Sequence, residues 1–315
     1  MIRIPRAAAH LTDQVPAAAE QLRTDGACLL RGVVDAAALD RMRAAVDALT
    51  GADLADLSGL AGDPSPARFR GGVDHWRTHP EFRAFATTGA LPAATAAVLG
   101  AARLWCYEDS VLVKDPGTPV ATRWHTDDGY FHVEGEQTVT VWLALDPAPR
   151  DSGSLRFAAG AHRDPTRYRP TLFVTDDPIP GTEGSLPPDL DPDAPGVFGW
   201  DLAPGDLTIH HARTLHAAGG NSGPTPRRAL SVRYCGDTAV VQVKPGAPGK
   251  PGFADVAPGT PVAEAAPTLG LPEAVLSSSL VVRPGPDPVS GSGRPSPPGR
   301  LRSGLGSGPT NREDR

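Results

Sequence analysis

The chain has 315 residues, 40% of them hydrophobic, and its formal net charge at pH 7 is −6. This length can bury the core of one large domain or of two small ones, and the absence of a dominant basic stripe argues against a nucleic-acid partner. No segment has the length of a signal-peptide core or a membrane span, so we expect a cytoplasmic protein with no membrane partner.

The first hundred residues are predicted to be mainly helical. Residues 15–35 predict a short helix, a turn at Asp25–Gly26 and then a buried strand. Asp35 is a plausible N-cap for the next helix, and Gly51 a plausible stop. One face of that helix carries four apolar side chains, namely Leu39, Met42, Val46 and Leu49.

The remainder of this region alternates between irregular and helical sequence. The stretch 52–75 is rich in Gly, Asp and Pro, which predicts a loop. The stretch 79–100 returns to helical character, with a break expected near Pro92.

From Arg103 onward the pattern predicts short strands. β-Branched and aromatic runs end at Pro, Gly or Asp, in the segments 103–117, 136–147, 153–162, 205–216 and 227–237. Strands without intervening helices favour an antiparallel sandwich or barrel over a parallel sheet. The predicted class is therefore mainly β, with helices over about 1–100 and a β core over about 101–245.

Two stretches look irregular. Residues 174–200 form an acidic, Pro-rich insertion between strands, which predicts a surface loop or a lid. Residues 284–315 are almost wholly Gly, Pro, Ser, Arg and Asp, so we expect a disordered tail whose removal leaves activity intact. Residues 1–283 would then form a single domain.

The cysteines predict no cross-links. Cys28, Cys106 and Cys235 are odd in number, far apart and each among apolar neighbours. We interpret them as buried free thiols rather than a disulfide framework or a zinc site. The sequence does not indicate an oligomeric state.

Histidine and a carboxylate two residues apart on an extended chain point to the same side, where both can bind one metal ion. The sequence contains this spacing four times: His79/Glu81, His125/Asp127, His132/Glu134 and His162/Asp164. The first pair lies at a predicted helix start, where Glu favours the helix dipole. The last lies in an Arg-rich turn. A hydrogen-bonded turn remains an alternative for His125 and Asp127.

A facial triad needs a second histidine from a distant strand, and it leaves three open positions on iron. The segment 205–216 offers His210, His211 and His216. The first two are adjacent in a predicted strand, so one faces inward and the other outward. His216 ends the segment and precedes a Gly-rich turn, which could hold its imidazole rigidly.

Taken together, four segments and their order resemble the phytanoyl-CoA dioxygenase family, which consists of non-haem Fe(II), 2-oxoglutarate-dependent oxygenases. The resemblance runs from about Asp25 to Asp237 and rests on DGACLLRGVVD, WHTD, VTVWLALDPAPRDSGSLRFAAGAHR and GDLTIHHARTLHAAGGNSGPTPRRALSVRY. It implies a double-stranded β-helix, the jelly roll of cupins, wrapped by N-terminal helices.

The resemblance also implies roles for single residues. His125, Asp127 and His216 would be the metal ligands, and Arg227 would grip the far carboxylate of 2-oxoglutarate in two parallel hydrogen bonds. Arg228 should face the other way, toward solvent or an acidic residue. Two further positions are candidates for contact with the cosubstrate: Lys114, with a surface lysine as the alternative, and Trp142, with core packing as the alternative.

The implied reaction uses Fe(II), 2-oxoglutarate and O2 to hydroxylate an unactivated C–H bond of a small molecule, for which a bacterial natural-product intermediate is the hypothesis. Because related halogenases lack the carboxylate ligand, Asp127 argues against chlorination. Ring closure, epimerisation or desaturation with the same cofactors is the main alternative. Less favoured are a non-redox cupin-like metalloenzyme and a binding module that has lost catalysis.

Side chains for substrate recognition are more weakly indicated. An aromatic pocket could be lined by the residues that flank the metal motif, namely Trp124, Tyr130, Phe131 and His132. An anionic substrate could meet Arg163, Arg167 and Arg169, for which a solvated basic turn is the alternative.

Overall fold

The computed structural model describes residues 9–276. The predicted disordered tail, residues 284–315, lies outside the described residues, so its dispensability and the domain boundary at residue 283 stay predictions. Within the described part, no helix is long and apolar enough to cross a membrane. Cys28, Cys106 and Cys235 are free and buried, as expected.

The described residues form seven α-helices and thirteen strands. The helices are α1 Ala9–Asp25, α2 Ala36–Asp47, α3 Leu57–Leu60, α4 His75–Thr78, α5 Pro80–Thr87, α6 Ala90–Leu99 and α7 Val262–Leu269. The strands are β1 Ala27–Leu30, β2 Ala55–Asp56, β3 Phe69–Val73, β4 Trp105–Lys114, β5 Thr122–His125, β6 Val133–Glu134, β7 Thr138–Ala144, β8 Leu155–Ala158, β9 Val197–Gly199, β10 Leu207–His211, β11 His216–Ala218, β12 Arg227–Cys235 and β13 Val240–Val241.

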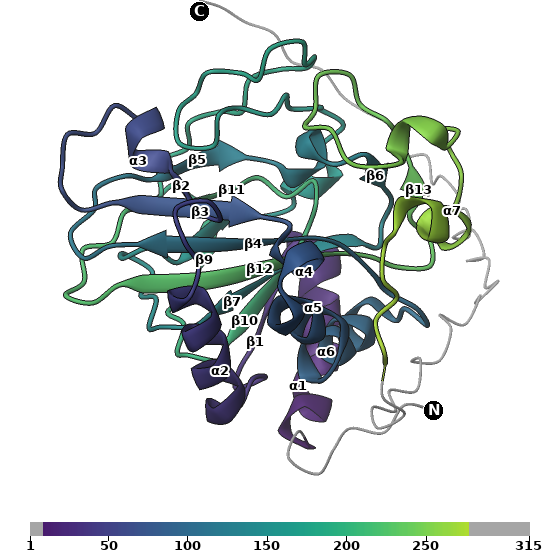
Figure 1. The fold of residues 1–315 in the computed structure, drawn as a ribbon, viewed down its shortest axis with the longest axis horizontal. Coiled ribbons are helices and arrows are strands. Elements are labelled where there is room, and N and C mark those ends of the chain that lie inside the picture. The colour runs from purple at the N-terminus through teal and green to yellow at the C-terminus, as the bar shows by residue number, and fades with distance from the viewer. Residues whose placement is uncertain (1–8, 277–315) are drawn as a thin grey trace, which may run out of the picture. The chain divides into compact units, whose positions relative to one another are not determined.

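Two antiparallel sheets build the jelly roll (Figure 1). The larger sheet has the order β1-β10-β7-β12-β4-β3-β2, and the smaller one has the order β5-β11-β8-β9. Apolar side chains of both sheets meet in one cluster, in which Trp142 and Ala229 of the larger sheet join Leu155 and Phe157 of the smaller one. The expected double-stranded β-helix fold is thereby confirmed.

Helices α1, α2, α4, α5 and α6 cover the outer face of the larger sheet (Figure 1). Leu11 and Val15 of α1 and Met42 of α2 share a buried cluster with outward-facing sheet residues such as Val141 and Ile209. Burial of these apolar side chains contributes hydrophobic stabilisation to the sheet. The inner face is free to carry polar groups.

Helix α2 follows the sequence signals closely. The Asp35 side chain accepts a hydrogen bond from the Ala38 amide at 2.8 Å, which makes it the N-cap of α2. The expected apolar face of α2 is buried, apart from Leu49, which is partly buried. The helix ends at Asp47, before the predicted stop at Gly51.

Two predictions for this region are wrong. The stretch 52–75, predicted as a loop, contains β2, α3 and β3. Gly72 in this stretch serves close packing, because an added Cβ would lie 2.0 Å from the Asp53 carbonyl oxygen. The helical break lies at Gly89 instead of Pro92, which sits in the first turn of α6, where proline is tolerated.

On the inner face of the larger sheet, cross-strand partners line up in rows of side chains. One row places His210, Thr140, Arg233 and Glu108 on neighbouring strands. The next row contains Thr208, Trp142, Ser231 and Ser110, and a more distant row contains Arg227, Lys114 and Phe69. Because side chains alternate between faces with a period of two, these groups all point between the two sheets.

Gly26, in the turn between α1 and β1, offers a test of this packing. Its φ is +84°, and an added Cβ would lie 2.4 Å from His162 Nδ1 and 2.6 Å from Thr214 Oγ1. We expect Gly26→Ala to lower the free energy of unfolding by about 2 kcal/mol or more, since strain and overpacking add.

Gly62→Ala is the matched control, because Gly62 has φ +67° and no atom within 4 Å of an added Cβ. It should cost only the strain of about 1 kcal/mol. Urea unfolding measures both variants, and equal losses would contradict the packing argument.

Candidate metal centre and its pocket

Three side chains converge between the sheets. His125 ends β5, Asp127 begins the short 3-10 helix η2 (Asp127–Tyr130), and His216 begins β11. Asp127 Oδ1 lies 3.7 Å from His125 Nε2 and 3.8 Å from His216 Nε2. All three residues are buried, and their ligand atoms lie within 4.8 Å of one another, so they could hold one metal ion.

Both imidazoles are held in the tautomer that a metal needs. His125 Nδ1 donates to the Arg123 carbonyl at 2.7 Å, and His216 Nδ1 donates to the Thr214 carbonyl at 2.9 Å. Because a carbonyl only accepts, each proton sits on Nδ1 and each Nε2 lone pair stays free. Burial lowers the pKa of His125 to about 3 and that of His216 to about 4, so both rings are neutral at pH 7.

Asp127 is ionised and held from its far side. Burial alone would raise its pKa, but His216, His210 and Arg233 together hold the pKa well below its usual value. Its Oδ2 accepts a hydrogen bond from Thr140 Oγ1 at 2.5 Å, which leaves Oδ1 for an ion. Two neutral imidazoles and one carboxylate are the donor set of non-haem Fe(II) sites, so the residues fit that metal.

Arg227 extends the same pocket away from the triad. It begins β12, is 2% exposed, and its Nε and Nη1 have no hydrogen-bond partner. Its guanidinium carbon lies 5.5 Å from the centre of the Trp142 ring. Burial lowers its pKa only to about 10, so it stays charged at pH 7. A buried, unpaired guanidinium fits a carboxylate ligand.

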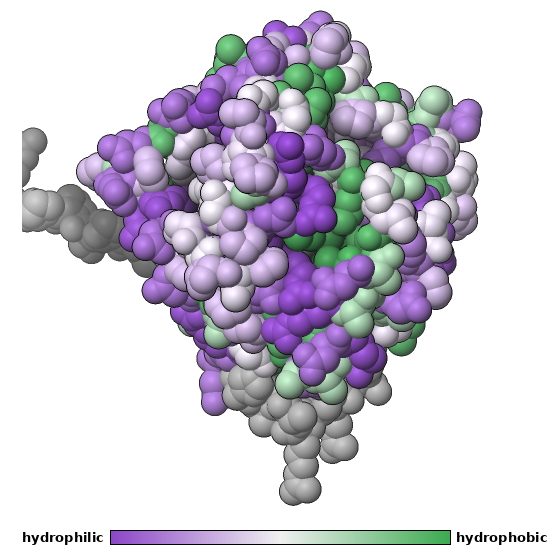
Figure 2. Space-filling model, turned by 60° about the vertical axis from the view of Figure 1, so that its left-hand side comes forward, coloured by the Kyte–Doolittle hydropathy of each residue, from purple (hydrophilic) through white to green (hydrophobic). Residues whose placement is uncertain are grey.

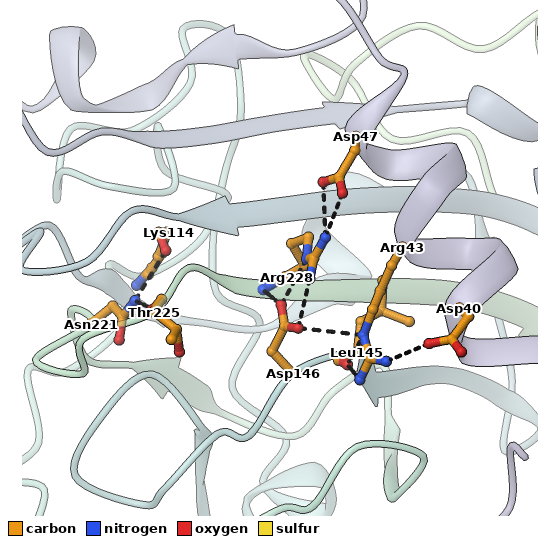
Figure 3. Close-up of polar contacts among 9 residues, drawn as sticks. All are labelled: Asp40, Arg43, Asp47, Lys114, Leu145, Asp146, Asn221, Thr225 and Arg228. Atoms are coloured by element: carbon orange, nitrogen blue, oxygen red, sulfur yellow. Dashed lines mark hydrogen bonds and ion pairs between the residues drawn. The ribbon is translucent and has the colours of Figure 1, made fainter. Parts of the chain in front are cut away.

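Arg228 faces the opposite side of the sheet, as expected from the strand period. Its Nε and Nη2 each bond Asp146 at 2.8 Å, and its Nη1 reaches Asp47 of α2 at 2.7 Å (Figure 3). Arg43 of α2 also pairs with Asp146, with its Nε 3.4 Å from Asp146 Oδ1. These ion pairs link the helix to the sheet, and they hold Arg228 outside the pocket.

Lys114 is buried, which rules out the surface-lysine alternative. Its Nζ donates to the Gly219 carbonyl at 2.5 Å and lies 4.4 Å from the centre of the Phe69 ring. Its backbone carbonyl accepts from the side-chain Nδ2 of Asn221 at 3.0 Å (Figure 3). It is the cross-strand neighbour of Arg227, but it is absent from the pocket lining.

Trp142 combines both expected alternatives. Its side chain belongs to the apolar cluster between the sheets, and it also lines the pocket between the triad and Arg227. The pocket lining consists of Leu112, Thr122, His125, Asp127, Thr140, Trp142, Leu155, Phe173, His210, His216, Ala218, Arg227, Ser231 and Arg233.

The other histidine–carboxylate pairs do not form metal sites. His79 pairs with Asp53 at 3.2 Å. His132 is occupied at both ring nitrogens, by the Pro248 carbonyl and the Lys244 amide. Over residues 9–276, the triad is the single group of three or more His, Cys, Asp or Glu side chains arranged for an ion.

His210 and His211 diverge as expected from their adjacency. His210 faces the triad, with Nε2 at 3.4 Å from Asp127 Oδ2. His211 lies on the other face, and its ring centre is 5.6 Å from that of His162.

The expected aromatic pocket is not formed by the residues that flank the metal motif. Trp124 donates its indole N–H to the Leu190 carbonyl, and Phe131 packs in a separate core beside Tyr107. Tyr130 does lie against the triad: its ring is edge-on to that of His125, with the ring centres 6.0 Å apart. These side chains leave their strand segment in directions that the sequence pattern does not specify.

The Arg-rich turn is occupied by the protein itself. Arg167 pairs with Asp128 at 3.0 Å, Arg163 donates to the Arg23 carbonyl, and Arg169 donates to Thr182. Because these arginines already have partners within the protein, the structure favours the basic-turn alternative over an anion-binding site.

Phe173, just before the acidic insertion, supplies the aromatic wall instead. Its ring lies 5.1 Å from that of His125 and lines the pocket. Its φ is +70°, and the Val174 amide bonds the Leu172 carbonyl across it, which is a strained γ-turn. The Arg123 amide bonds the Phe173 carbonyl at 3.0 Å. This part of the chain therefore packs against the metal-binding strand.

Known proteins resemble this chain in sequence and in fold. The sequence model of the family described as Phytanoyl-CoA dioxygenase (PhyH) matches residues 22–229. A curated relative, the probable alpha-ketoglutarate-dependent hypophosphite dioxygenase of Stutzerimonas stutzeri, is 24% identical over 129 residues. That match covers 41% of this chain and 44% of the relative, so it spans less than half of either protein.

Solved structures share the fold. The carbocyclase SnoK from nogalamycin biosynthesis is 22% identical with a TM-score of 0.56, and the match covers 78% of this chain and 92% of that one. The epimerase SnoN from the same biosynthesis is 24% identical with a TM-score of 0.54, over 79% and 95%. EvdO2 from Micromonospora carbonacea var. aurantiaca is 23% identical with a TM-score of 0.51, over 73% and 93%.

Removal of His216 tests the metal site. We expect His216→Ala to weaken Fe(II) binding by at least about 100-fold, since loss of a direct ligand should exceed the 10–100-fold effect of outer-shell partners. Anaerobic equilibrium dialysis measures the affinity. His79→Ala removes a histidine from a rival pair and should bind Fe(II) like the parent. A similar loss in both variants would count against the triad.

Strain at Phe173 predicts an unusual order of stabilities. Phe173→Gly should unfold at a higher urea concentration than Phe173→Ala, because glycine adopts φ +70° without strain and alanine does not. The expected difference is about 1 kcal/mol. The reverse order would show that the γ-turn is not present in solution.

Proposed function

The chain belongs to the phytanoyl-CoA dioxygenase family of non-haem iron, 2-oxoglutarate-dependent oxygenases, and we propose that it hydroxylates an unactivated C–H bond of a small molecule. The observation that carries the proposal is the pairing of a complete metal triad with an unpaired, buried Arg227 in one pocket. A non-redox metalloenzyme with the same ligands would have no use for that arginine.

His125, Asp127 and His216 would hold Fe(II) through two Nε2 atoms and Oδ1. Three protein ligands leave positions for a chelating cosubstrate and for O2. The bound iron and 2-oxoglutarate together supply an O2-derived oxidant that can take hydrogen from a C–H bond. Thr140 and the carbonyls of Arg123 and Thr214 keep the ligand atoms oriented.

Arg227 would bind the distal carboxylate of 2-oxoglutarate through its unpaired Nε and Nη1. The Trp142 ring lies between this guanidinium and the triad and forms a flat wall for the cosubstrate. Lys114 lies beside the arginine on the neighbouring strand, and its Nζ bonds the Gly219 carbonyl in the turn between β11 and β12.

Apolar side chains restrict water near the reacting C–H bond. Leu112, Leu155 and Phe173 line the pocket, and Leu112 and Phe173 also join an apolar cluster with Leu57 of α3 and Phe69 of β3. Figure 2 brings the side of Figure 1 that carries α3 and β3 toward the viewer, and it shows hydrophobic surface recessed between hydrophilic rims. An apolar carbon skeleton suits such an approach.

The substrate class is proposed from the solved structures that share this fold. SnoK and SnoN act in nogalamycin biosynthesis, and SnoN has been solved with Fe3+, alpha ketoglutarate and nogalamycin RO. We therefore propose a natural-product intermediate as the substrate of this chain. Ring closure or epimerisation is the second candidate reaction, because a carbocyclase and an epimerase share the fold.

Cosubstrate binding tests the enzyme class. Anaerobic titration of the Fe(II) protein with 2-oxoglutarate should produce a weak visible charge-transfer band. Arg227→Met should need about tenfold or more 2-oxoglutarate for the same band, since a charge-assisted pair is lost. Arg228→Met, on the opposite face, should titrate like the parent. A parent without a band despite bound iron would favour the non-redox metalloenzyme alternative.

Product mass tests the reaction. Candidate natural-product scaffolds are incubated with the iron-loaded enzyme, 2-oxoglutarate and O2, and the products are weighed by mass spectrometry. Hydroxylation adds one oxygen atom. Loss of two hydrogens would indicate ring closure or desaturation, and an unchanged mass with a new retention time would indicate epimerisation.

A further inference from the structure

Arg233 is a second buried arginine in the metal pocket, and neither the motif nor the proposed cosubstrate site accounts for it. It lies on β12 six residues after Arg227, so the two side chains share one face of the strand. At 3.3–3.4 Å per residue, their Cα atoms are about 20 Å apart. Arg233 lies beside Thr140, which bonds Asp127, and thus occupies the metal end of the pocket.

The guanidinium of Arg233 is incompletely paired. Its Nη1 donates to Ser110 Oγ and lies 3.6 Å from Glu108 Oε1. Its Nε is buried without a partner, and no described residue bonds its Nη2. The whole residue is only 8% exposed, and it opens onto the pocket. Buried donors without partners are costly, which points to a missing acceptor.

The nearby carboxylate does not neutralise this arginine by itself. Glu108 is held by Lys250 at 2.5 Å, Lys250 by Asp74 at 2.6 Å, and Asp74 by Arg77 at 3.5 Å. The chain of ion pairs thus contains three cations and two anions, with Arg233 at its pocket end.

Asp109 adds little compensating charge. It lies on the other face of β4, where its Oδ1 accepts from the Trp76 amide at 3.2 Å. Burial raises its pKa to about 7, so it is only partly ionised near neutral pH. The chain of ion pairs that ends at Arg233 therefore carries one surplus positive charge.

The proposed cosubstrate complex does not consume that charge. The formal charges in that complex sum to zero. Fe(II) and the Arg227 guanidinium carry the positive charges, and the Asp127 carboxylate and the two carboxylates of 2-oxoglutarate carry the negative ones. Imidazoles that bind a metal are neutral, and burial lowers the pKa of Lys114 well below its usual value. Arg233 thus keeps an incompletely paired guanidinium at the metal end of the pocket.

We propose that Arg233 is a substrate-binding residue, which holds a carboxylate or another anionic oxygen of the primary substrate beside the metal centre. The inference rests on the proposed function, since it assigns a substrate class to the same site. An anchored oxygen at this end would fix which C–H bond faces the iron. Capture of the metal-end carboxylate of 2-oxoglutarate is the competing role, and the experiment separates the two.

The test uses benzoate and benzamide as probes, which share a ring and differ in charge. Each is titrated anaerobically into the Fe(II) and 2-oxoglutarate complex, with calorimetry for the affinity and the charge-transfer band to show that 2-oxoglutarate stays bound. The parent should bind benzoate more tightly than benzamide. Arg233→Met should weaken benzoate by about tenfold or more and leave benzamide unchanged.

Two further variants make the comparison specific. Arg233→Lys retains the charge without the planar fork, so its benzoate affinity should lie between those of the parent and Arg233→Met. Arg228→Met alters the opposite face of the same strand and should bind both probes like the parent. If Arg233→Met fails to fold, weaker benzoate binding by Arg233→Lys carries the test.

Each contrary result has a separate meaning. Equal affinities of the parent for benzoate and benzamide, or unchanged benzoate affinity in Arg233→Met, would overturn the proposal. Weaker 2-oxoglutarate binding in that variant, with benzoate unaffected, would assign Arg233 to the cosubstrate. Absence of the band in the parent would instead defeat the proposed function itself.

Discussion

The direct pairing of His125 with His216 across β5 and β11 is the constraint on which the rest of the site depends. It places two residues that are distant in sequence opposite each other on adjacent strands. Each ring then donates its Nδ1 proton to the carbonyl two residues earlier in the chain, so the same local device orients both ligands. Asp127 enters from the next turn, because the chain leaves β5 directly into η2.

The two faces of the larger sheet have different roles: the outer face packs against the helices, and the inner face lines the metal pocket. The outer face buries apolar side chains under the helices, whereas the inner face carries Thr140, Trp142, Arg227 and Arg233 in paired rows. Charges buried in this way cost free energy unless ligands complete their hydrogen bonds. The unpaired nitrogens of the two arginines therefore mark where anionic groups fit, and the strained turn at Phe173 lies in the same pocket.

Much of the site could be predicted because its signals are local. The spacing of His125 and Asp127, a histidine before a Gly-rich turn and an arginine at a strand start are short patterns within a recognisable family order. The opposite orientations of Arg227 and Arg228 follow from the strand period alone. The same period extended to Arg233 would have placed that residue in the pocket as well, but its ion-pair surroundings come from three separate segments.

The sequence by itself determined the β-rich class, the α2 cap and the metal motif, since periodicity, capping and motif spacing act over a few residues. Tertiary structure alone decided that residues 69–73 join the sheet, that Phe173 and not Phe131 meets the metal pocket, and that Lys114 is buried. Those outcomes depend on contacts between residues far apart in the chain, and local composition does not encode which partner a side chain will meet.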